Sequence, residues 1–114
     1  MMILGDLDTR EIDLVTVHVD MRKGYNKLAS YASAALDIDI TEERNYVLFI
    51  NSHAKALKLI GQCGNIRLLI NIKLDKGSFQ RVQQRTHEPS YIKLTKQEFL
   101  NYIQGYQIMT CRAI

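Results

Sequence analysis

The sequence predicts an α+β fold: an antiparallel β meander of about four to five strands packed on one longer helix, with a short C-terminal helix. Apolar side chains recur at helical spacing over residues 21–37, and strand-like runs joined by tight turns follow. A capping-box sequence opens the second helix, over residues 96–104. The 114 residues match the usual size of one domain, so a single domain is expected, with 1–12 and 107–114 at its periphery.

The N-terminal part of the predicted domain holds one strand and the longer helix. Residues 14–19 are mostly β-branched, which is typical of a strand. Asp20 follows directly and is expected to be the N-cap of the helix, because a carboxylate accepts hydrogen bonds from the free N–H groups of a first turn. Gly24 lies inside the predicted helix, where a glycine indicates either a close approach to the backbone or an occurrence by chance.

Four further strands and the short helix are predicted after this. The strands cover residues 46–50, 55–60, 66–74 and 91–94. The second and third are joined by a glycine-bearing connection at 61–65, and such short connections favour antiparallel neighbours. The polar segment 80–90 is expected to be a loop. Thr95 and Glu98 form the capping box of the short helix, and Gly105 suits its C-terminal end.

Composition and motifs exclude several classes of protein. Apolar residues make up 46% of the chain and no apolar run approaches the ~20 residues of a membrane span, so no membrane partner is expected. No signal-peptide pattern is present, which indicates a cytoplasmic location. Cys63 and Cys111 are interpreted as reduced thiols. His18 and Asp20 have no identifiable third ligand, so neither a metal, a cofactor nor a catalytic residue is predicted.

Charge is divided unevenly along the chain. Residues 1–43 carry nine acidic and four basic side chains, whereas residues 44–114 carry eleven basic and three acidic ones. Such asymmetry indicates a polyanionic partner. The alternative is attraction between the two halves of the chain itself.

Arg22, Lys23 and Lys27 are the most informative cations. Positive side chains near a helix N-terminus oppose the helix dipole, so helix stability does not favour them there. A DNA phosphate would be favoured at the same place, and Gly24 would let it approach the backbone. The alternative is an ion pair between these cations and Asp20 or the acidic N-terminal segment.

A second basic set lies on the predicted strands and loop. On one face of a sheet it could follow a phosphate backbone without reading base sequence, although a solvated sheet face is the commoner explanation. Its members are Lys55, Lys58, Arg67, Lys73, Lys76, Arg81 and Arg85.

Several short motifs together resemble a known family. Residues 20–24 read DMRKG, which resembles the signature of the small accessory protein of IS66-type insertion sequences, the Orf2-like or TnpB family. Residues 57–60 with Gly64 and Asn65 resemble the hairpin of that family, and residues 74–79 resemble its LEKGRF run. Leu94 and Thr95, with Gln104 and Gly105, resemble its C-terminal helix. The resemblance covers about residues 14–106.

The resemblance implies a non-catalytic role in the transposition of a bacterial mobile element. Catalysis in such an element belongs to a separate, larger transposase, so we expect this chain to bind DNA, the transposase, or both. The alternative is a module that binds only protein, including a second copy of itself, through an exposed sheet edge or the tail at 106–109. The chain departs from the family pattern at Gln62 and Cys63, at residues 70–72, at Ser78 and in having no tryptophan.

Overall fold

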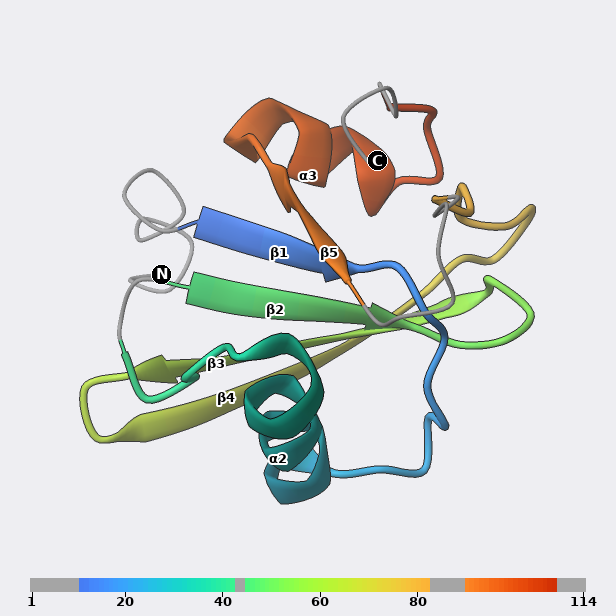
Figure 1. The fold of residues 1–114 in the computed structure, drawn as a ribbon. Helices are drawn as coiled ribbons and strands as arrows, with labels where there is room; N and C mark the ends of the chain where they lie inside the picture. The colour runs from blue at the N-terminus through green and yellow to red at the C-terminus, as the bar shows by residue number, and fades with distance from the viewer. Residues whose placement is uncertain (1–10, 43–44, 83–89, 109–114) are drawn as a thin grey trace.

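The computed structural model describes residues 11–42, 45–82 and 90–108, which form one five-stranded mixed sheet between two helices (Figure 1). The strands are β1 (Glu11–Val15), β2 (Asn45–Ile50), β3 (Ala56–Cys63), β4 (Ile66–Lys73) and β5 (Tyr91–Leu94). The helices are α2 (Tyr25–Leu36) and α3 (Lys96–Tyr102). The sheet order is β4-β3-β2-β1-β5, with α2 and α3 on opposite faces. The predicted α+β class is confirmed.

One strand pair corrects the predicted antiparallel meander. β1 and β2 run parallel, with Ile12 opposite Tyr46, while the other three pairs are antiparallel. Parallel neighbours need a crossover of a dozen or more residues, and the segment that carries α2 provides it. The meander prediction is confirmed for β2, β3 and β4, which short connections join, and was wrong for the other two strands: β1 reaches β2 through α2, and β5 pairs with β1.

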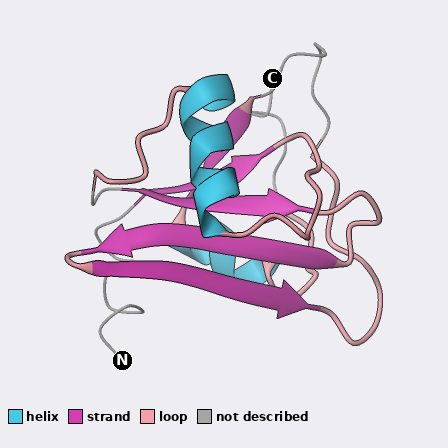
Figure 2. Cartoon of the chain, turned by 90° about the horizontal axis from the view of Figure 1, so that it is seen from below, coloured by secondary structure: helices cyan, strands magenta, loops and turns pink. Residues whose placement is uncertain are grey.

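The core lies on both faces of the sheet. One cluster fills the space between the sheet and α3, and a second fills the space between the sheet and α2. β2 serves both: Tyr46 and Leu48 belong to the first cluster, Val47 and Phe49 to the second. Figure 2 looks onto the second face, where α2 lies across the sheet and packs against β3 and β4.

The start of α2 differs from the prediction. The helix begins at Tyr25, and its N-cap is Gly24, which is extended (φ −88°, ψ −174°) and makes no side-chain cap. Asp20 is therefore not the cap. Its Oδ1 accepts the Arg22 N–H at 2.8 Å, and its carbonyl accepts the Lys23 N–H at 3.1 Å. This carboxylate stabilises a tight turn that precedes the helix, a common use of aspartate.

Two other boundaries also move. β1 starts at Glu11, so Glu11 and Ile12 are part of the sheet rather than peripheral. The hairpin turn is Gly64 and Asn65 alone, with φ +57° at Gly64, because β3 continues to Cys63. Gly61, predicted to be in the turn, lies inside β3.

The predicted capping box of the short C-terminal helix is confirmed. The Glu98 N–H donates to Thr95 Oγ1 at 3.2 Å, and the Thr95 N–H donates to Glu98 Oε1 at 2.9 Å. Gly105 takes a positive φ of 85° just after the helix, and the Ile108 N–H donates to Gln80 Oε1 at 2.6 Å, so the chain up to residue 108 packs on the sheet. Residues 83–89 of the predicted loop and the tail from 109 lie outside the described residues. No helix in the described part is long and apolar enough to cross a membrane.

Candidate nucleic-acid interface

The sheet brings several of the predicted cations to one face. Side chains two apart on a strand share a face, and Leu69 packs in the cluster under α2. Arg67 and Lys73 of β4 therefore lie on the α2 face, as does Lys58 of β3, which pairs with Asn71. From Arg67 to Lys73 the strand advances about 20 Å.

Lys58 ties the segment before α2 to this face. Its Nζ donates to the carbonyl oxygen of Lys23 at 2.7 Å. The ammonium of Lys23 in turn lies 5.7 Å from the centroid of the Tyr31 ring, a cation–π contact. An ammonium has three N–H donors, so Lys58 keeps two for another acceptor. The two lysines are thus held side by side although they come from segments 35 residues apart.

Arg67 is positioned by the first turn of α2. Its guanidinium carbon lies 5.6 Å from the centroid of the Tyr25 ring, and its Nη1 donates to Asn26 Oδ1 at 3.0 Å. The Tyr25 hydroxyl donates to Gln62 Oε1 at 3.3 Å, and burial raises the pKa of Tyr25, which keeps this hydroxyl neutral. Sequence reasoning missed Asn26, because its contact reaches a residue 41 positions away and leaves no local signal.

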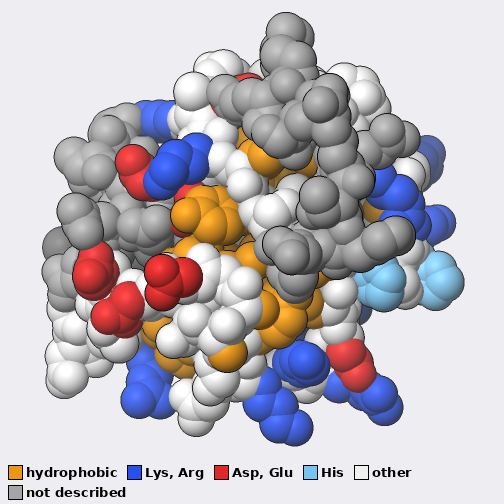
Figure 3. Space-filling view, in the orientation of Figure 1, with side chains coloured by type: hydrophobic (Ala, Val, Ile, Leu, Met, Phe, Trp, Pro, Cys, Tyr) orange, Lys and Arg blue, Asp and Glu red, His pale blue; other side chains and the backbone are white. Residues whose placement is uncertain are grey.

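Lys27 and Lys73 complete this surface. Both are exposed, Lys27 in the first turn of α2 and Lys73 at the end of β4. We call Lys23, Lys27, Lys58, Arg67 and Lys73 the basic face. Figure 3 shows lysine and arginine side chains along the lower margin of the molecule, around α2.

Arg22 is engaged differently. Its Nε lies 3.0 Å and its Nη2 2.7 Å from Oδ2 of Asp20, and its side chain is 91% exposed. These hydrogen bonds lower the pKa of Asp20 to about 2. The ion pair that the sequence left as an alternative is therefore present. Gly24 beside it is open, since an added Cβ would meet no atom within 4 Å.

The charges around α2 run against the helix dipole. Its first turn contains no acidic residue and its last turn no basic one. The acids Asp37, Asp39 and Glu42 instead follow its C-terminal end, and Figure 3 shows a separate group of acidic side chains on the left. Stabilising charges would have the opposite order. Local helix stability therefore does not explain where these charges lie.

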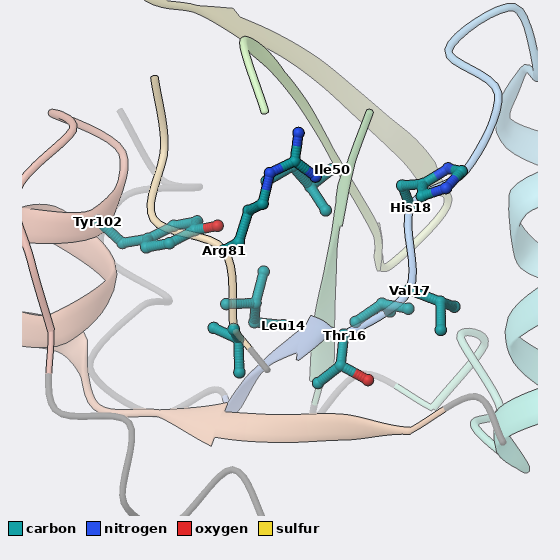
Figure 4. A pocket seen from close by; sticks show the side chains of 9 residues that line it. Leu14, Thr16, Val17, His18, Ile50, Arg81 and Tyr102 are labelled. Carbon is teal, nitrogen blue, oxygen red and sulfur yellow. The ribbon is translucent and has the colours of Figure 1, made fainter. Parts of the chain in front are cut away.

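Arg81 lies at another part of the molecule. It donates to the carbonyl oxygen of Ser52 and borders a hollow of about 360 Å³. Figure 4 shows the Tyr102 hydroxyl pointing toward Arg81, with His18 on the far side of the hollow. The Tyr102 hydroxyl donates to the carbonyl of Gln80 at 2.7 Å, and burial raises its pKa. The lining of this hollow is mostly apolar, and Arg81 is the predicted cation that borders it.

The remaining predicted residues do not join the basic face by any described contact. Lys55 and Lys76 are exposed outside the strands, and Arg85 lies outside the described residues. Among the described residues, no three histidine, cysteine or acidic side chains are placed to hold a metal ion. Cys63 is half-buried at the end of β3, and Cys111 is outside the described part.

Comparison with known proteins identifies the family. The family model described as IS66 Orf2 like protein matches residues 10–113, nearly the whole chain and somewhat more than the motifs alone indicated. No curated protein and no solved structure matches the chain. The chain therefore belongs to the IS66 Orf2-like family, the accessory, non-catalytic proteins of IS66 insertion sequences.

Proposed function

We propose that this protein serves its element in the bacterial cytoplasm as a non-catalytic factor that binds DNA through the phosphate backbone. The observation that supports this most is the basic face. Its five cations come from the segment before α2, from α2 itself, from β3 and from β4, and three of them are held in place by contacts to other segments. Fixed cations lose less conformational freedom on binding a polyanion than mobile ones do.

The N-terminus of α2 adds to the attraction for phosphate. Gly24 provides no side-chain oxygen to the first-turn N–H groups, and no acid lies in that turn. Free N–H groups and the positive end of the helix dipole both favour an anion there. Lysines and arginines that contact phosphates position a protein on DNA without reading its sequence. We therefore expect binding with little sequence preference.

A second candidate function is the binding of a protein such as the transposase of the element. Ile66, at the start of the outer strand β4, is 55% exposed, and it continues a row of apolar side chains on that strand that are only partly buried. A surface for protein and a surface for DNA are compatible on one accessory factor.

Fluorescence anisotropy of a labelled random DNA duplex tests the DNA proposal. Five phosphate contacts predict a salt slope of about −4.5, so the affinity should fall roughly 500-fold between about 50 and 200 mM salt. The double variant Lys27→Ala/Lys73→Ala removes two exposed cations of the basic face and should reduce the slope by about two.

Lys76→Ala/Lys96→Ala is the matched control. It removes the same charge from exposed lysines outside the basic face and should leave the slope nearly unchanged. Equal effects of the two double variants would mean that general charge attraction, rather than this face, binds DNA. Absence of binding at about 50 mM salt would overturn the proposal.

A further inference from the structure

The outer edge of β4 is open. β4 is eight residues long and is hydrogen-bonded to β3 on one side only, within the described part of the chain. The opposite edge strand, β5, has four residues, and its central Lys93 is paired with Glu11. Short, charged edges resist the addition of another strand, whereas a long edge presents unpaired main-chain N–H and C=O groups to it.

The two faces of β4 differ in chemistry. Ile66, Leu68, Ile70 and Ile72 share one face, where Ile66 is exposed and the other three are only partly buried. Arg67, Asn71 and Lys73 share the other face with Leu69, and β4 contains no acidic residue. A strand added at this edge would therefore lie beside an apolar row on one side of the sheet and, on the other, beside a row with a cation at each end.

We propose that the β4 edge binds an extended segment of another protein as a sixth strand, and that this segment alternates acidic and apolar residues. Main-chain hydrogen bonds would supply affinity, and the alternating side chains would supply specificity. The acidic side chains would lie opposite Arg67 and Lys73, since opposite charges across strands attract. The apolar side chains of the bound segment would cover Ile66 and the other apolar residues on the same face of β4.

Charge disfavours a second copy of this chain as the occupant. A two-fold axis perpendicular to the sheet pairs β4 with itself in antiparallel orientation. Centred on Leu69 or Ile70, it puts Arg67 diagonal to or directly opposite Lys73 of the second copy, on both sides of the axis. Like charges in those positions are destabilising.

This inference goes beyond the proposed DNA contact and does not depend on it. A peptide can occupy the β4 edge whether or not DNA binds, because the edge is defined by main-chain groups and by the apolar row. The DNA experiment measures binding of duplex DNA, whereas the strand experiment measures binding of a peptide and protection of the β4 amides. Lys73 belongs to both surfaces, so the peptide and the β4 amides, rather than the Lys73 variants, distinguish the two proposals. If one of the two proposals fails its experiment, the other proposal is unaffected.

The test uses a labelled nine-residue peptide of alternating glutamate and valine. Fluorescence anisotropy should show binding, and 15N-labelled protein should show shifted and exchange-protected amides in β4. A peptide of the same composition with the alternation scrambled should bind at least about tenfold more weakly, since its side chains cannot separate onto two faces. Equal binding of the two peptides would mean simple charge attraction and would overturn the proposal.

Charge reversal sharpens the result. In Arg67→Glu/Lys73→Glu, affinity for the glutamate–valine peptide should fall about tenfold or more, and a lysine–valine peptide should bind instead. The matched control Lys76→Glu/Lys96→Glu should retain the glutamate–valine preference. Lys73 is exposed, so Lys73→Glu alone serves if the double variant does not fold. No peptide binding, perturbation away from β4, or a dimer in sedimentation with β4 already protected would each overturn the proposal.

Discussion

Gly61 is a position where a single contact, with the ring of Tyr46, requires a glycine. It lies inside β3, and a Cβ built there would come 2.2 Å from Cδ1 and 2.5 Å from Cε1 of Tyr46. The Tyr46 ring is fully buried. Gly61→Ala should therefore lower the free energy of unfolding by about 1–3 kcal/mol through overpacking, measured by urea denaturation.

Gly24→Ala is the comparison for this substitution. Gly24 has φ −88° and open space around its α-carbon, so an added methyl group meets nothing. The free energy of unfolding should therefore change less in Gly24→Ala than in Gly61→Ala. A Gly61→Ala protein as stable as the parent would show that the Tyr46 ring does not constrain this position.

The Asp20–Arg22 pair gives a pH prediction. Because Arg22 lowers the pKa of Asp20 from 3.8 to about 2, the contribution of this carboxylate to stability is present above pH 3.8 and is lost as the pH falls through about 2. An NMR titration of the Asp20 carboxyl carbon should give a midpoint near 2. In Arg22→Ala the midpoint should move back toward 3.8, and an unchanged midpoint would contradict the assignment.

Residue contacts of this kind were the least predictable part of the molecule. The sequence placed Gly61 in a turn because Gly64 follows closely, whereas the Tyr46 ring that requires a glycine belongs to another strand. The alternation of β4 did predict that Arg67 and Lys73 share a face. It did not predict that Asn26 and Tyr25 would hold Arg67, since contacts between distant segments have no periodic signature.

At the scale of elements, α3 depends on its capping box. It has only seven residues, too few to be stable alone, yet it buries Phe99 and Tyr102 in the core. Thr95→Ala should cost about 1 kcal/mol of unfolding free energy, because the Glu98 N–H loses its acceptor. Urea denaturation measures this, and Thr95→Ser should retain most of the stability. Equal losses in both variants would show that the hydroxyl is not the stabilising group.

The elements themselves were largely predictable, but two of their relations were not. In the sequence, the helical spacing of apolar residues begins at residue 21, whereas the helix itself starts at Tyr25. The difference arises because Met21 packs beside α2 in the same core cluster. The parallel pairing of β1 and β2 was missed. A signal existed in residues 46–50, which are all apolar or aromatic and are buried on both faces, as is typical of a central strand beside a crossover helix.

At the scale of the whole molecule, the sheet should be protected unevenly against hydrogen exchange. Amides of β1 and β2 lie between two neighbouring strands and within both core clusters, so they should exchange slowly. In β4, the amides that face β3 should be slow and the alternate ones fast. Exchange followed by NMR in the free protein tests this. Uniform protection along β4 would mean that its outer edge is already covered.

The position of β1 has a consequence for synthesis of the chain. Ile12 pairs with Leu94, 82 residues later. A strand that leaves the ribosome early therefore cannot complete its pairing until one of the last strands has been synthesised. Until residues 91–94 emerge, β1 has an open edge beside Leu14 and Val15, which are almost completely buried in the finished fold. A message interrupted before residue 90 would yield a chain without β5 and α3, with apolar surface for proteases and aggregation to act on. Copies of the element damaged there should leave no half-active fragment.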